Sequence, residues 1–83
     1  MSSVWITGAH GFVGRNLARH LHANGSVIYG LGHGAWPSVQ AESWGVSYWI
    51  NGELTASNFR TLQDCSGRPD IIYHLAGGSS VGL

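Results

Sequence analysis

Charged side chains are scarce in this sequence, and lysine is absent from it. Only 10% of the 83 residues are charged, and four arginines balance four acidic residues, so that the formal net charge is zero. The arginines are spread along the chain, at Arg15, Arg19, Arg60 and Arg68. Binding to a nucleic-acid backbone needs basic side chains gathered on one surface. We therefore expect no nucleic-acid partner.

Cysteine and long apolar runs are also lacking. The single cysteine, Cys65, has no partner within the chain for a disulfide bond. No charged start followed by an apolar stretch indicates a signal peptide, and no run is long enough to span a bilayer. These absences predict a cytoplasmic protein that does not enter a membrane.

Five histidines and four tryptophans stand out in so short a chain. The histidines lack the close pairings with cysteine or acidic residues that a zinc site requires, so we expect no metal. His20 and His22 are interpreted as solvated helix residues. The tryptophans are expected in the core or an interface rather than as a stacking platform.

Short apolar segments separated by turn residues make up much of the chain, which is 43% hydrophobic. Four of them are rich in β-branched or aromatic residues, and we predict strands there: Val4–Ile6, Val27–Leu31, Val46–Ile50 and Asp70–Leu75. Strands without polar alternation are typical of a parallel sheet covered by helices on both faces. The pattern predicts one α/β domain.

Two helices are predicted between the strands. The first starts at Phe12 and stops at Asn24-Gly25, with an apolar face formed by Phe12, Val13, Leu17, Ala18 and Leu21. The second follows a cap at Thr55 or Ser57, and its apolar side comprises Phe59, Leu62 and Cys65. The segment Ala35–Gly45 has no clear period and is expected to be a loop with a short helix.

Three evenly spaced glycines, Gly8, Gly11 and Gly14, lie between the first strand and the first helix. A glycine turn there lets the main chain approach a diphosphate, while the helix N-terminus offers free N–H groups to the anion. Gly14 would instead allow the helix to pack closely on the strand. The spacing G-x-x-G-x-x-G differs from the usual dinucleotide fingerprint, so a glycine-rich turn without a ligand is the alternative.

Residues 7–14, TGAHGFVG, resemble the T-G-x-x-G-[FY]-[IV]-G signature of the extended short-chain dehydrogenase/reductases, which include nucleotide-sugar epimerases and dehydratases. Asn51–Leu54 resembles that family's G-D-[LI] turn, and residues 70–77 are similar to its fourth strand, D-x-[IV]-[IVF]-H-L-A-[AG]. The resemblance implies a partial Rossmann fold with a parallel sheet of about four strands in the order 3-2-1-4 and flanking helices.

The resemblance also implies a role for each matching residue. The pyrophosphate loop would be formed by Gly8, Gly11, Phe12 and Val13. Glu53 and Leu54 would contact the adenine, and the inner ribose and nicotinamide would lie against Leu75, Ala76 and Gly77. His10 is either a cofactor contact or an exposed loop residue, and Ser79 or Ser80 is a candidate substrate contact.

The second strand departs from the family pattern at its end. An aspartate that binds the adenosine ribose is common there, but this chain has Gly32 followed by His33. No arginine lies between Arg19 and Arg60 to hold a 2′-phosphate. We therefore favour NAD, with NADP left open because a protonated His33 offers a partial clamp.

The family's catalytic tyrosine, followed four residues later by a lysine, is missing. Tyr29, Tyr48 and Tyr73 are followed at that distance by His33, Gly52 and Gly77. We therefore expect no catalytic residue within this chain. Residues 1–83 are interpreted as the N-terminal part of a NAD(P)-binding Rossmann domain, truncated after the fourth strand, whose open sheet edge promotes self-association.

The expected function is the dinucleotide-binding portion of an NAD-dependent nucleotide-sugar epimerase/dehydratase. Two alternatives remain open at this point. The chain is either part of an NADP-dependent reductase of the atypical short-chain branch, or a non-catalytic module that senses a dinucleotide.

Overall fold

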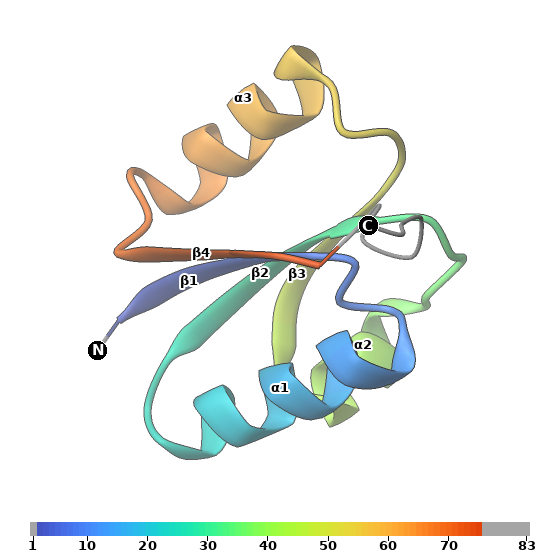
Figure 1. The fold of residues 1–83 in the computed structure, drawn as a ribbon, viewed down its shortest axis with the longest axis vertical. Coiled ribbons are helices and arrows are strands. Elements are labelled where there is room, and N and C mark those ends of the chain that lie inside the picture. The colour runs from blue at the N-terminus through green and yellow to red at the C-terminus, as the bar shows by residue number, and fades with distance from the viewer. Residues whose placement is uncertain (1, 76–83) are drawn as a thin grey trace.

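The computed structural model describes residues 2–75, which form a four-stranded parallel sheet between two layers of helices (Figure 1). In chain order the elements are β1 (Ser3–Thr7), α1 (Phe12–Ala23), β2 (Val27–Gly32), α2 (Ser38–Ser43), β3 (Val46–Asn51), α3 (Ala56–Ser66) and β4 (Ile71–His74). The strand order is β3-β2-β1-β4. The predicted α/β class and strand order are confirmed, as is the short helix within residues 35–45.

Each face of the sheet has its own apolar cluster, because successive side chains of a strand point to opposite faces. Val4 and Ile6 of β1 pack with Ala18 of α1 and Ala41 of α2. Trp5, between them in the sequence, packs on the other face with Leu62 of α3. The central strand is therefore buried on both sides, which explains its unbroken apolar sequence.

The helix boundaries follow local signals. At the start of α3 the Thr55 side chain accepts a hydrogen bond from the backbone N–H of Asn58 at 3.1 Å, so Thr55 is the cap. The chain leaves α1 through Gly25, whose φ of +96° suits glycine. His20 and His22, in the last turn of α1, are exposed as predicted.

Two predictions of burial were wrong. Phe12 and Val13 are 82% and 66% exposed, because the first turn of α1 extends past the carboxyl end of β1, and Gly14 and Ala18 are the buried residues of this helix. Cys65 is exposed rather than partly buried, and Leu62 is the buried residue of α3. Helical spacing predicts which residues share a face, but not how far along the helix that face is covered.

A β-bulge shifts the pairing of the edge strand β3. Ile28 of β2 pairs with Val46, whereas the next residue, Tyr29, pairs with Tyr48, so that Ser47 is the extra residue. Beyond the bulge Trp49 pairs with Gly30 and packs on the α1 side of the sheet. A Cβ at Gly30 would lie 2.9 Å from the Trp49 ring, so glycine makes room for the indole.

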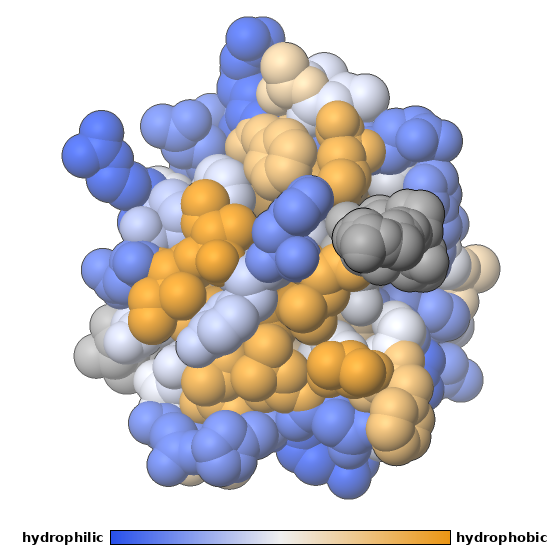
Figure 2. Space-filling model, viewed as in Figure 1, coloured by the Kyte–Doolittle hydropathy of each residue, from blue (hydrophilic) through white to orange (hydrophobic). Residues whose placement is uncertain are grey.

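The other edge strand, β4, leaves apolar side chains uncovered. Ile71 is 45% and Ile72 53% exposed, and the two point to opposite faces of the sheet. Figure 2 shows the apolar surface that gathers along this edge and the adjoining helices. The edge is therefore open on both faces within residues 2–75. No helix in that part of the chain has the length and apolar character needed to cross a bilayer.

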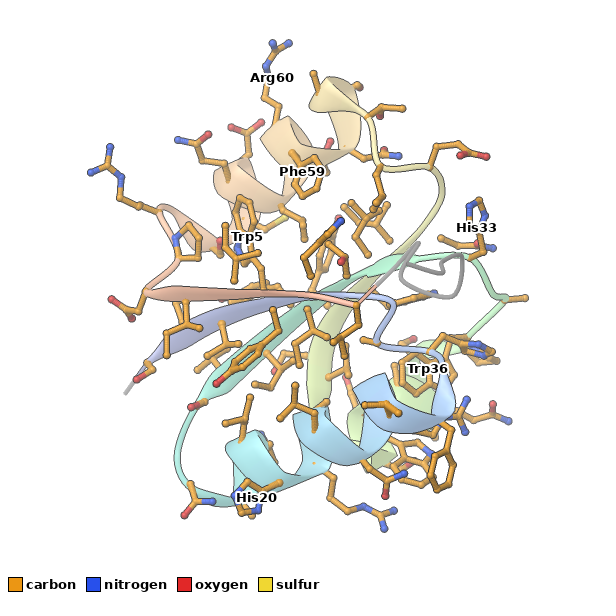
Figure 3. All side chains as sticks on the ribbon, viewed as in Figure 1. Trp5, His20, His33, Trp36, Phe59 and Arg60 are labelled. Atoms are coloured by element: carbon orange, nitrogen blue, oxygen red, sulfur yellow. The ribbon has the colours of Figure 1, made fainter. Side chains whose placement is uncertain are left out.

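Helix α3 covers its face of the sheet through few contacts. Leu62 is fully buried against Trp5 and Leu31. The Trp5 ring lies 6.0 Å from that of Phe59, and its Nε1 donates a hydrogen bond to Ser66 Oγ at 2.8 Å (Figure 3). Leu62 is therefore the one residue of α3 that is fully buried, and Phe59 packs beside it.

We predict that Leu62→Ala lowers the free energy of unfolding by about 3 kcal/mol, because it leaves a cavity under a helix with no other buried residue. The exposed neighbour Gln63→Ala is the control and should change stability by less than about 0.5 kcal/mol. Urea unfolding followed by circular dichroism measures both. Equal midpoints for the two variants would show that α3 is held by other contacts.

Candidate functional site

The carboxyl ends of the four strands lie at one edge of the sheet, and backbone hydrogen bonds join the turns that follow them. Gly8 N–H, after β1, donates to Leu31 O of β2 at 2.8 Å. Gly52 N–H, after β3, donates to Gly32 O at 2.8 Å, and Leu75 N–H, after β4, donates to Thr7 O at 3.0 Å. In open α/β sheets ligands bind at this edge. The predicted site residues within 2–75 all lie at the end of β2, on these turns or in the first turn of α1.

The glycine loop after β1 leads directly into the N-terminus of α1. Gly8 has φ +80°, and its carbonyl accepts a hydrogen bond from Gly11 N–H at 3.1 Å, closing the turn. Gly11 is the N-cap residue, and within residues 2–75 no side chain caps the helix. The first turn also lacks an acidic residue. Its free N–H groups and the positive end of the helix dipole therefore face outward beside the exposed Gly11.

The three glycines of the loop differ in what surrounds them. A Cβ at Gly14 would lie 2.7 Å from Ala9 Cα and still closer to the Gly8 carbonyl oxygen. Gly14 therefore lets α1 approach the turn itself, rather than the strand as predicted. At Gly11 the nearest atom of the described chain would be Gly8 O, at an ordinary 3.5 Å. Internal packing therefore gives no reason for a glycine at position 11.

Arg15 holds the loop from within the helix. Its Nε and Nη2 both donate to the His10 carbonyl oxygen, at 3.1 and 2.8 Å. Its guanidinium carbon lies 5.1 Å from the centroid of the Trp36 ring, in the range of a cation–π contact. The His10 ring packs edge-on against Trp36 at 5.0 Å, so the side chain is half-buried among aromatic residues. Sequence reasoning missed Arg15, whose only signal was its position next to Gly14.

The turns after β2 and β3 carry the second group of predicted residues. Gly32 is buried, whereas His33 and Glu53 are exposed. His33 Nε2 lies 3.6 Å from Glu53 Oε1. Leu54, the other predicted adenine contact, is 38% exposed. The structure thus brings His33 and Glu53 together, which the sequence did not predict.

The ends of β1 and β4 are joined through side chains. Thr7 is fully buried, and its Oγ1 forms a hydrogen bond of 2.8 Å with Nδ1 of His74. Leu75 is half-buried and packs against the apolar cluster between the sheet and α1. The predicted contacts Ala76, Gly77, Ser79 and Ser80 lie outside the described residues.

A model of the NAD-dependent epimerase/dehydratase family matches residues 4–83. The chain belongs to this family. The match confirms the resemblance to the extended short-chain dehydrogenase/reductases that the three motifs indicate. Members of the family are enzymes that use a nicotinamide dinucleotide. No curated protein and no solved structure matches the chain.

Elsewhere, a cavity of about 250 Å³ lies between α2 and β3, where it is lined by Trp36, Ser38, Ala41, Val46, Ser47, Tyr48 and Trp49. It lies beside the first half of β3 rather than at the strand ends where family members bind their cofactor. Hydrogen bonding with the Cys65 side chain raises the pKa of the Tyr48 phenol above its ordinary value. Two of its lining residues, Trp36 and Trp49, also contact the His10 ring of the glycine loop.

The remaining candidates are accounted for by packing. Trp5 and Trp36 are 6% and 7% exposed, and Trp44 and Trp49 pack against the core, which confirms the core interpretation of the tryptophans. Within residues 2–75 no three His, Cys, Asp or Glu side chains come together in a way that could hold a metal ion.

We predict that Gly14→Ala destabilises the chain by about 2 kcal/mol or more. Alanine is the better helix former by about 1 kcal/mol, but its methyl group would overlap backbone atoms of Gly8 and Ala9, which cannot turn away. Gly11→Ala, one turn earlier, is the matched control and should stay within about 1 kcal/mol of the wild type, because its methyl group would make only an ordinary contact with Gly8 O at 3.5 Å. Urea unfolding compares them. Similar stability of the two variants would contradict the packing role of Gly14.

Proposed function

We propose that this chain binds NAD at its glycine loop, as the cofactor-binding portion of an epimerase or dehydratase that acts on a nucleotide sugar. The observation that carries the proposal is Gly11. A side chain is missing there although the described fold has room for one, and the position lies at an uncapped, outward-facing helix N-terminus. A cofactor diphosphate is a ligand that would need both features.

In this proposal the loop binds the cofactor through its main chain. Gly8, Gly11, Phe12 and Val13 would surround the pyrophosphate, with backbone N–H groups as donors. Two exposed apolar side chains, Phe12 and Val13, flank the helix end, and a ligand seated on the loop would shield them from water. Gly14 lets α1 pack closely on the turn, and Arg15 fixes the loop by donating hydrogen bonds to the His10 carbonyl oxygen.

The rest of the cofactor would extend along the strand ends in two directions. The adenine would lie toward Glu53 and Leu54, and the nicotinamide toward Leu75 with Ala76 and Gly77. When bound, NAD supplies the group that takes up a hydride from a sugar carbon and returns it. The residues of this chain bind and orient that group.

Catalysis would need groups that these 83 residues do not contain. The chain has no lysine, so it offers no tyrosine–lysine pair to move the proton of a sugar hydroxyl. We propose that the pair comes from another part of the protein and that this chain alone is inactive.

We predict that Gly11→Ala lowers the affinity for NADH at least about tenfold, because its methyl group occupies the space in which the diphosphate would approach the main chain. Energy transfer from tryptophan to bound NADH, with calorimetry as a second readout, measures the affinity of the 83-residue chain. The urea midpoint of the same variant shows whether its fold is intact.

The wild-type chain should bind NADH, and Gly11→Ala should keep the fold and lose the binding. If a folded wild-type chain gives no signal with either NADH or NADPH, the proposal is wrong. Unchanged NADH binding by a folded Gly11→Ala chain would place the ligand elsewhere.

We further propose that the isolated chain self-associates through β4. Among the described strands β4 has a neighbour on one side only, and it exposes Ile71 and Ile72 on opposite faces, which is the form of edge that pairs with a second strand.

We predict that light scattering gives a mass above the monomer value of 8.9 kDa at high concentration. Ile72→Lys should restore the monomer, because a charge at the edge opposes strand pairing. Val39→Lys, at a 79% exposed apolar position on α2, is the control and should leave the mass unchanged. A wild-type chain that stays monomeric would refute the edge proposal.

A further inference from the structure

We propose that Glu53 selects NAD over NADP by binding the adenosine ribose at the end of β2, in place of the acidic residue that β2 lacks. This inference rests on the cofactor site proposed above. It moves Glu53 from the adenine, where the family resemblance places it, to the ribose. A carboxylate at that point accepts hydrogen bonds from the two ribose hydroxyls and repels a 2′-phosphate.

The end of β2 cannot supply this group itself. In dinucleotide-binding folds an acidic residue about 20 positions after the glycine loop binds the ribose, and that distance leads to the end of β2. Gly32 stands there and is buried. A Cβ at Gly32 would lie 3.2 Å from both Gly8 N and the Trp49 ring, so a side chain there would crowd the glycine loop and the indole. The next residue, His33, is not acidic.

A carboxylate reaches the same place from the neighbouring strand. Glu53 follows β3, and its Oε1 lies 3.6 Å from Nε2 of His33. His33 is labelled in Figure 3. The side chain of His33 is 71% exposed and that of Glu53 is 75% exposed, so a ligand can reach both. Where the family signature has aspartate, this chain has glutamate, whose extra methylene extends the carboxylate toward β2.

Hydrogen bonds, rather than the exposed side chains of His33 and Glu53, hold the turn after β2 close to the turn after β3. Gly52 N–H donates to Gly32 O at 2.8 Å, immediately before Glu53 and His33. On the other side of His33, Gly34 N–H donates to Asn51 Oδ1 at 3.0 Å, and its carbonyl accepts from Trp49 Nε1 at 2.9 Å. These three bonds hold Glu53 beside the end of β2.

The surrounding charges agree with this assignment. A 2′-phosphate is usually held by arginine, and no arginine lies between Arg19 and Arg60 in the sequence. Arg15 is occupied with the His10 carbonyl and the aromatic rings. Two imidazoles lie at the turn after β2: the His10 ring is packed against Gly34, and the His33 ring faces Glu53. A phosphate placed there would meet the carboxylate, whereas two hydroxyls would bond to it.

The test compares NADH and NADPH affinities of the wild-type chain, Glu53→Gln and the control Glu42→Gln, by tryptophan-to-coenzyme energy transfer. Glu42 is an exposed glutamate on α2 that lies toward the opposite end of β3. We expect the wild-type chain and Glu42→Gln to prefer NADH by about tenfold or more, and Glu53→Gln to lose about tenfold of that preference. His33→Ala should keep the preference for NADH.

The outcomes separate the two proposals. Binding of neither coenzyme by the folded wild-type chain overturns the cofactor site and the assignment of Glu53 with it. Binding of NADH with the same NADH-to-NADPH ratio in the wild-type chain and Glu53→Gln overturns the assignment alone. A wild-type preference for NADPH that His33→Ala abolishes would make His33 the selecting residue instead.

Discussion

The contact between α1 and the turn after β1 is the constraint on which the rest of the structure depends. Gly14 has no side chain, so the helix lies directly on the backbone of Gly8 and Ala9. This contact brings the N-terminus of α1 to the carboxyl end of the central strand, and Arg15 then fixes the loop between them through the His10 carbonyl. The orientation of the helix dipole toward the proposed diphosphate position follows from that packing.

The two halves of the sheet differ in how completely residues 2–75 cover them. On the β3 side, a bulge and the glycine at position 30 let Trp49 pack over the sheet, and Trp49 in turn anchors the turn after β2 through Gly34. On the β4 side, Ile71 and Ile72 remain exposed on both faces. The proposed adenosine end of the site therefore lies on the well-packed side, and the nicotinamide end beside the open edge.

Much of the fold could be predicted from the sequence because its signals are local. Short β-branched runs gave the four strands, and the turn residues around Gly25 and Thr55 gave the helix boundaries. Predictions failed where burial depends on the extent of the neighbouring layer. The periodic position of Phe12 predicts a packed side chain, yet the sheet ends before it, and Cys65 meets only the exposed Tyr48 of the edge strand β3 and stays exposed.

The sequence by itself determined the class of fold, the family and the position of the glycine loop, because strand, turn and helix signals there lie within one short segment. The tertiary structure alone decided that Gly14 serves packing and that Gly11 does not, since that depends on how closely α1 lies against the backbone of Gly8 and Ala9. It also decided that Glu53 lies beside His33. Parallel pairing of β2 and β3 carries residues that are distant in the chain to adjacent turns, and no local pattern records that proximity.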